Sequence, residues 1–164
     1  MGLEKHVIRY KSGDEKAFDD IYSETFPLVR FAIYQIIPNK YVVEDLTQEV
    51  FMKVVSHIQH YSEKNFKAWI YRVAKNSALD YLKKKKEIIS DDVDFLENTK
   101  KTHPYLYYAI RHLSEQEREV FLMKVLYGHT TKKIAQILDL SPSVINQIYY
   151  DAKEKLKKSL EEND

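Results

Sequence analysis

The chain has 164 residues, 44% of them hydrophobic, and its 26 lysines and arginines nearly balance 25 aspartates and glutamates, for a net charge of +1. This apolar content can bury a core, so we expect a folded protein of one domain or two small ones. The absence of cysteine excludes disulfides, thiol catalysis and cysteine-ligated zinc within this chain. No stretch has the apolar run of a signal peptide or a membrane span, and we therefore expect a cytoplasmic protein without direct membrane insertion.

Helices are predicted throughout, because only three glycines occur and no stretch alternates with a period of two. The expected fold class is all-α. In chain order, residues 17–22 carry a first apolar face, and Pro27 can open a second helix that Pro38 would end. Two longer amphipathic helices are expected over residues 43–58 and 65–86. The inner face of the helix at 43–58 is predicted to carry Leu46, Val50, Val54 and Ile58.

An acidic segment separates the two halves of the chain. Residues 87–104 hold five acidic residues against two basic ones and end on a proline, which is typical of an interdomain linker. We therefore predict an N-terminal domain over residues 1–86, a flexible acidic linker over 87–104 and a C-terminal domain over 105–164.

The C-terminal domain begins with a short helix expected over residues 106–113. Ser114, followed three residues later by Glu117, is a capping box that opens the next helix, and Gly128 would stop it. The segment 128–156 then predicts a helix-turn-helix.

Three residues mark the turn and the second helix of this motif. Asp139 suits the turn, since aspartate tolerates a left-handed backbone better than most residues. Ser141 is placed to cap the second helix, with Pro142 at its first position. A buried stripe at helical spacing is expected at Ile145, Ile148, Tyr149, Ala152 and Leu156.

The opposite side of this helix is polar, and we predict that it contacts DNA. Asn and Gln can pair in bidentate fashion with adenine in the major groove, while Ser, Tyr and Lys can reach bases or phosphates. The alternative is an ordinary helical hairpin whose polar outer face is merely solvated. The candidate residues are Ser143, Asn146, Gln147, Tyr150 and Lys153.

Positive charge is concentrated in one segment of this nearly neutral chain. Residues 67–86 hold seven basic residues against one acidic residue, which suggests a local contact with a polyanion. Aromatic residues just upstream, Tyr61, Phe66 and Trp69, suit stacking of single-stranded bases, although core packing of the last two is equally open. Favourable interaction with the helix dipole is the other explanation of the lysines. The candidates for binding single-stranded nucleic acid are Tyr61, Asn65, Arg72, Lys75, Asn76, Lys83 and Lys84.

The helix over residues 43–58 has an acidic, partly apolar outward face. It carries Asp45, Gln48, Glu49 and Met52, opposite the buried stripe. A solvated surface is the ordinary interpretation of such charges, and a functional surface is the alternative.

Three blocks of the chain, taken in order, resemble a known family. EDLTQEVFMKV at 44–54, NFKAWIYRVAKNSALDYLKKKK at 65–86 and residues 113–158 are similar to blocks of bacterial RNA polymerase sigma factors of the extracytoplasmic-function type. The resemblance implies that the outward face at 43–58 docks on the clamp of the largest core polymerase subunit. It further implies that the loop and helix at 61–86 capture an unpaired base and hold the opened −10 strand of promoter DNA.

For the C-terminal domain the resemblance implies reading of the −35 element and contact with the flap of the second-largest polymerase subunit. Members of the family commonly have an inhibitory anti-sigma factor that masks the polymerase and DNA surfaces, and nothing in this sequence identifies such a partner. The chain departs from the family pattern at Lys133 and Asp139, where an acidic residue and a glycine are common. It also has Asn146 and Ile148 where the recognition helix often carries basic residues. These differences leave the promoter sequence unpredicted.

Three other classes of function are weighed against this expectation. A metal-dependent nuclease would need ligands such as Asp45, Glu49 and His57, but no second matching acidic pair accompanies them. An autonomous helix-turn-helix regulator would have a similar C-terminal domain, yet the sequence has no dimerisation heptad or ligand-pocket signature. An interaction module could use the basic helix to bind an acidic protein. We expect no enzyme activity, no metal and no cofactor.

Overall fold

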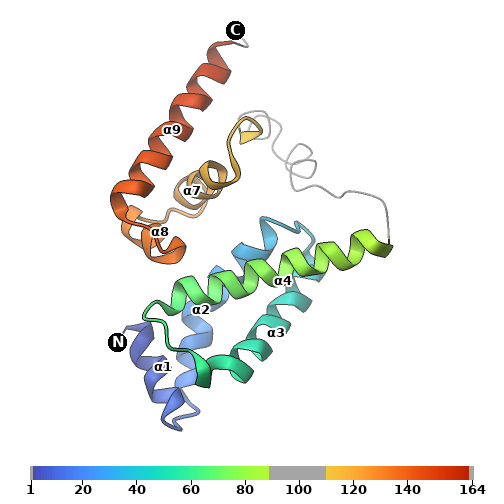
Figure 1. The fold of residues 1–164 in the computed structure, drawn as a ribbon, viewed down its shortest axis with the longest axis vertical. Coiled ribbons are helices and arrows are strands. Elements are labelled where there is room, and N and C mark those ends of the chain that lie inside the picture. The colour runs from blue at the N-terminus through green and yellow to red at the C-terminus, as the bar shows by residue number, and fades with distance from the viewer. Residues whose placement is uncertain (1, 89–109, 163–164) are drawn as a thin grey trace. The chain divides into compact units, whose positions relative to one another are not determined.

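The computed structural model describes residues 2–88 and 110–162, and within them every regular element is helical (Figure 1). The all-α prediction is thus confirmed. The chain divides into two compact units, Met1–Phe95 and Leu96–Asp164, called the N-terminal unit and the C-terminal unit below. The predicted linker at 87–104 lies almost wholly outside the described residues, so its flexibility and the domain bounds stay predictions.

The N-terminal unit is built around one central helix, α2, which packs against α1, α3 and α4 (Figure 1). Its core includes the fully buried residues Ile21, Val29, Val50, Val54 and Phe66. Burial of such apolar side chains is the main force that holds these helices together, since most helical stability in proteins comes from packing of an apolar face. The elements are α1 (Leu3–Lys11), α2 (Ala17–Tyr34), α3 (Lys40–His57), the 3-10 helix η1 (Ile58–His60) and α4 (Phe66–Ile88).

The start of the chain differs from expectation, because no helix was predicted there. Leu3 and Val7 of α1 are buried, and the ring of His6 lies 3.1 Å from a carboxylate oxygen of Asp20 on α2. Apolar residues four apart lie on one helix face, so the spacing of Leu3 and Val7 was the sequence signal for this helix. The many charged residues around them made the apolar pattern hard to recognise.

The predicted helix start at Pro27 is also wrong, since Pro27 lies inside α2. Buried residues occur on both sides of it, at Ile21 upstream and at Leu28, Val29 and Ala32 downstream. A proline removes one backbone hydrogen bond from a helix interior. Here the continuous buried stripe offsets that loss, because helix stability in proteins comes mostly from tertiary packing.

The two longer predicted helices are confirmed with small shifts at their ends. Asn39 caps α3 by accepting hydrogen bonds from the backbone N–H groups of Tyr41 and Val42, at 3.0 and 3.2 Å. Asn65 accepts from the N–H of Ala68 at the start of α4. The predicted inner face is buried: Leu46, Val50 and Val54 lie in α3, and Ile58 opens η1, which follows it.

In the C-terminal unit the local signals prove reliable. The capping box is formed, with the Glu117 N–H donating to Ser114 Oγ and the Ser114 N–H donating to the Glu117 carboxylate. Asp139 has φ 56 and ψ 44, the left-handed conformation expected at the turn. The helix predicted over 106–113 lies mainly outside the described residues. The elements are α7 (Glu115–Val125), α8 (Thr131–Leu138) and α9 (Pro142–Glu161).

Candidate nucleic-acid interface

The polar side of α9 is open to solvent, as predicted. Ser141 Oγ accepts from the Val144 N–H and starts the helix. Ile145, Ala152 and Leu156 are buried against the rest of the unit, whereas Ile148 and Tyr149 of the predicted stripe are only half-buried. The exposed residues, called the reading face below, are Ser143, Asn146, Gln147, Tyr150 and Lys153.

Hydrogen bonds tie two amides of the reading face to other side chains. The Thr131 hydroxyl on α8 donates to Asn146 Oδ1 at 3.1 Å, and Lys124 Nζ on α7 donates to the same threonine oxygen. Gln147 Nε2 donates to Asp151 Oδ1 at 2.9 Å. Helices α7, α8 and α9 are thereby joined at the side chain of Thr131.

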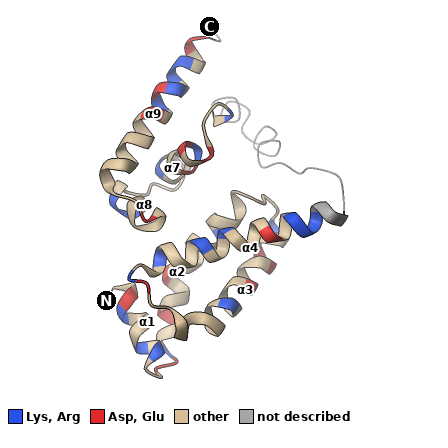
Figure 2. Ribbon diagram, viewed as in Figure 1, with Lys and Arg blue, Asp and Glu red and all other residues tan. Residues whose placement is uncertain are grey.

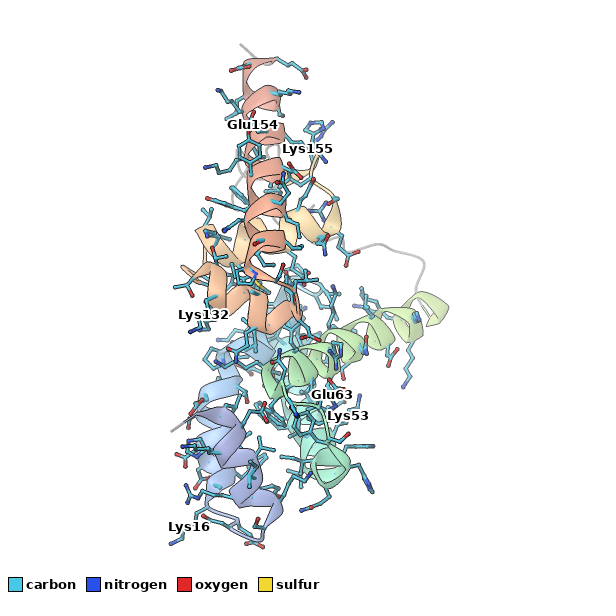
Figure 3. All side chains as sticks on the ribbon, turned by 60° about the vertical axis from the view of Figure 1, so that its left-hand side comes forward. Lys16, Lys53, Glu63, Lys132, Glu154 and Lys155 are labelled. Carbon is cyan, nitrogen blue, oxygen red and sulfur yellow. The ribbon has the colours of Figure 1, made fainter. Side chains whose placement is uncertain are left out.

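The ring of Tyr149, next to the reading face, forms cation–π contacts with two lysines. Lys124 Nζ lies 5.0 Å and Lys153 Nζ 5.2 Å from the ring centroid of Tyr149, which also stacks on Phe121. Cation–π contacts of this kind restrain long side chains that would otherwise move freely. On α8, Lys132 points outward to solvent (Figure 3).

A line of cationic and polar side chains runs along α4, and Figure 2 shows the cluster of lysines toward its C-terminal end. Asn76, Lys83 and Lys84 are exposed, and Lys75 is half-buried. Arg72 is exposed and forms an ion pair with Glu63 of the preceding loop. The structure therefore brings these predicted residues onto one helix, and we call Arg72, Lys75, Asn76, Lys83 and Lys84 the basic line.

A cavity of about 400 Å³ lies between the end of α3 and the first half of α4. Its lining includes exposed polar residues, and Lys53 Nζ on α3 donates to Ser77 Oγ on α4 at 2.9 Å. The sequence indicated Tyr61, Trp69 and Asn76, but the contributions of α3 and η1 were missed because they are distant in the chain. The lining residues are Lys53, His57, His60, Tyr61, Trp69, Val73, Asn76, Ser77 and Asp80.

Tyr61 is not the open stacking platform that was predicted. Its side chain is 7% exposed, and its ring packs against Phe66 and Trp69 at 5.2 and 5.3 Å between centroids. Phe66 is fully buried, whereas Trp69 is half-buried and lines the cavity. The ring of Tyr61 thus forms part of the cavity wall, and of the three aromatics Trp69 is the one that solvent reaches most readily.

Helix α1 holds this loop through two charged residues that sequence analysis did not single out. The carboxylate of Glu4 accepts hydrogen bonds from the Tyr61 hydroxyl at 3.2 Å and from the Phe66 backbone N–H at 2.5 Å. Lys11 Nζ donates to the Tyr61 carbonyl oxygen at 2.6 Å. Burial raises the pKa of the Tyr61 hydroxyl, and the nearby Glu4 carboxylate raises it further. Tyr61 therefore stays protonated and acts as a hydrogen-bond donor to Glu4.

The outward face predicted on α3 is exposed, and we call Asp45, Gln48, Glu49 and Met52 the acidic face. Met52 is 70% exposed, and Tyr41 at the start of the same helix is 77% exposed. An exposed surface that combines carboxylates with large apolar groups is typical of protein interaction sites.

Two further findings concern metals and membranes. Among the described residues no group of three or more histidines, aspartates and glutamates is arranged to hold a metal ion. His57 is exposed, with its Nδ1 2.8 Å from the Lys53 carbonyl oxygen. None of the described helices is long and apolar enough to cross a bilayer.

Comparison with known proteins gives a consistent family assignment. Residues 21–88 match the family described as Sigma-70 region 2, and residues 104–156 match Sigma-70, region 4. The ECF RNA polymerase sigma factor SigM of Bacillus subtilis is 28% identical over 150 residues, covering 85% of this chain and 92% of that protein. The ECF RNA polymerase sigma factor SigW of Bacillus subtilis is 24% identical and covers 98% of this chain and 97% of that protein. The structure of CnrH in complex with the cytosolic domain of CnrY has a similar fold, with a TM-score of 0.64, 18% identity and coverage of 97% of both chains.

Proposed function

The chain belongs to the sigma-70 family of RNA polymerase sigma factors, in its extracytoplasmic-function group, and acts in promoter-directed transcription initiation; we propose that its two units divide this work between the −10 and −35 elements. This activity takes place in the cytoplasm, where core polymerase and promoter DNA are found. The observation that carries the proposal is the presence on one chain of a reading face and of a basic line beside a cavity.

At the −10 element, the cavity between α3 and α4 receives an unpaired base. Its volume of about 400 Å³ accommodates a single nucleobase, and Trp69 offers a ring for stacking. The cations of the basic line then follow the phosphates of the same strand. Because these contacts form only with the melted strand, binding energy favours the open state of the duplex, and no hydrolysis is needed.

At the −35 element, α9 enters the major groove with its reading face toward the bases. Ser143, Asn146, Gln147 and Tyr150 carry hydrogen-bonding groups for base edges or phosphates. The reading face has one lysine, and so the exposed lysines Lys132 and Lys133 of α8 supply further phosphate contacts.

Two protein partners complete the proposal. The acidic face of α3 docks on the clamp of the largest polymerase subunit, with charge complementarity guiding encounter and register. The C-terminal unit contacts the flap of the second-largest subunit. The sigma factor RpoE of Bartonella quintana, which was solved with the anti-sigma factor NepR, has a similar fold, with a TM-score of 0.56, 17% identity and coverage of 89% of this chain and 98% of that chain. This similarity supports control of this chain by an anti-sigma factor.

Transcription in vitro from genomic fragments tests the proposal. With core polymerase the full chain should start RNA synthesis at defined sites, and the protein alone should bind the same promoters weakly. Strong specific footprints without polymerase would instead indicate an autonomous regulator.

A pair of double variants separates DNA contacts from protein contacts. Lys83→Gln with Lys84→Gln should reduce open-complex formation while core association is retained. Lys5→Gln with Lys16→Gln removes the same charge from exposed positions elsewhere in the N-terminal unit and serves as the matched control. Loss of core association in the first variant alone would contradict the assignment of these lysines to DNA.

A further inference from the structure

We infer that Thr131 and Lys124 fix the orientation of the Asn146 amide, so that its nitrogen faces the DNA and reads a hydrogen-bond acceptor on a base. This inference rests on the proposed reading of the −35 element by α9. It names the residues that decide which end of the Asn146 amide faces the DNA. Thr131 and Lys124 are positioning residues here, since they act through Asn146.

The atoms in contact give the donor and the acceptor at each step of this chain of side chains. A lysine ammonium can only donate, so Thr131 Oγ1 is the acceptor in its contact with Lys124 Nζ. The single hydroxyl hydrogen of Thr131 is then free to donate, and the Asn146 atom 3.1 Å away is the oxygen Oδ1. An amide that turns its oxygen toward α8 turns its NH₂ group away from α8.

The burial of the three residues supports a fixed arrangement. Lys124 and Thr131 are half-buried, whereas Asn146 is exposed. Lys124 is further restrained by the ring of Tyr149, at 5.0 Å from its centroid. Two restrained residues thus hold one end of an exposed amide and leave its other end available to a ligand.

The neighbouring amide has the opposite polarity. Gln147 Nε2 donates a hydrogen bond to Asp151 Oδ1, and a carboxylate oxygen can only accept. The other end of the Gln147 amide, the oxygen Oε1, takes no part in this contact. Adjacent positions of the reading face therefore offer a donor at Asn146 and an acceptor at Gln147.

This polarity has a consequence for base choice. In the major groove guanine presents N7 and O6, adenine N7 and thymine O4 as acceptors, whereas cytosine presents only its N4 amino donor. At the base that Asn146 contacts, cytosine is the base that offers its amide nitrogen no partner. A freely rotating amide could turn either its nitrogen or its oxygen toward the base and so pair with any of the four bases. The contact with Thr131 prevents this rotation.

A promoter library with a randomised −35 element and a constant −10 element tests the inference. The full chain and core polymerase transcribe the library, and sequencing of the RNA products gives the base preference at every position. Asn146→Ala should abolish the preference at one position and so identify the base that it reads. Thr131→Val, which removes the hydroxyl at nearly constant shape, should reduce discrimination at that same position by about 2- to 10-fold, the worth of one hydrogen bond.

A second substitution does not depend on Thr131. Asn146→Asp keeps an oxygen toward Thr131 but replaces the outward nitrogen with an acceptor, so the preference at the identified position should shift toward cytosine, whose N4 amino group donates. Thr131→Ser restores the hydroxyl and should retain the wild-type preference. Lys132→Met, at an exposed neighbour on α8, should change total transcription evenly without altering base preference.

Several outcomes would overturn the inference. It is wrong if Thr131→Val leaves the preference unchanged while the protein stays folded by circular dichroism, or if Thr131→Ser behaves as Thr131→Val does. It is also wrong if wild type prefers cytosine at the Asn146 position, or if Asn146→Asp makes no shift. A wild-type chain that transcribes the library with no −35 preference refutes the proposed −35 reading itself, and this result is seen without any variant.

Discussion

The two candidate DNA surfaces of this chain are built in different ways. In the N-terminal unit the cavity wall at Tyr61 is held by Glu4 and Lys11, which lie 57 and 50 residues away in sequence. In the C-terminal unit the reading face lies along one helix, α9. Ser141 caps the start of this helix, and Asp139, two residues earlier, forms the turn that precedes it. The first surface therefore depends on long-range packing, whereas the second depends mainly on local backbone signals.

This difference matters for how each surface responds to change. A site assembled from distant segments is lost when any one of them moves. A site on a single helix keeps its backbone shape as long as that helix is docked, and contacts from neighbouring helices, such as that of Thr131 with Asn146, orient individual side chains. The four predictions below test this contrast, beginning with the largest expected effect.

Phe66→Ala should destabilise the N-terminal unit by about 3–5 kcal/mol, because it removes a fully buried aromatic ring from the core. Hydrogen exchange of the backbone amides, measured on the full chain, should accelerate in α2, α3 and α4 and stay unchanged in α9. Equal acceleration in α9 would show that the two units are not independent in this respect.

Glu4→Ala should lower the free energy of unfolding by about 1–3 kcal/mol, since it leaves the Phe66 N–H and the Tyr61 hydroxyl without their acceptor. Denaturant unfolding measures this loss. With core polymerase, permanganate reactivity of −10 thymines should also fall, and a template with a pre-formed bubble should restore transcription.

Glu4→Gln is the matched control, because glutamine keeps an oxygen acceptor at the same place. It should retain most of the stability and of the promoter opening. If both variants open the promoter as well as wild type does, α1 does not position the loop.

Asp139→Val should destabilise the C-terminal unit by about 1 kcal/mol, because a β-branched residue is strained at a φ of 56. Asp139→Gly, which adopts this conformation without strain, should have little effect. Thermal unfolding followed by circular dichroism distinguishes them. Similar losses in both variants would point to a role of the carboxylate instead of the backbone.

Lys155→Met should have the smallest effect, about 0.2–1 kcal/mol, because the ion pair between Lys155 of α9 and Glu117 of α7 is partly exposed. Desolvation raises the pKa of Glu117, but the Lys155 ammonium and the Ser114 N–H outweigh it, so the pKa of Glu117 is lowered overall. A lowered carboxyl pKa stabilises the folded state at neutral pH, and this contribution disappears as the pH falls through the folded-state pKa. Unfolding of wild type and Lys155→Met should therefore differ at neutral pH and converge in acid. A constant difference across this range would contradict the coupling.

Local signals in the sequence determined much of this protein. The periodicity of apolar residues predicted α3 and α4, the capping box at Ser114 and the cap at Ser141 predicted two helix starts, and Asp139 marked the turn. The outward positions of the reading face and of the acidic face follow from the same periodicity. These features are encoded within a few residues of one another, and so they can be recognised without knowledge of the rest of the fold.

Only the tertiary structure decided the features that join distant segments. It showed α1 packed on α2, Pro27 tolerated inside a helix, Tyr61 buried beneath Glu4, and a cavity shared by α3, η1 and α4. It also showed which end of the Asn146 amide is engaged by Thr131. The physical reason is common to all of them: side-chain burial and hydrogen-bond partners depend on which surfaces meet in the folded chain, and spacing along the sequence does not specify that meeting.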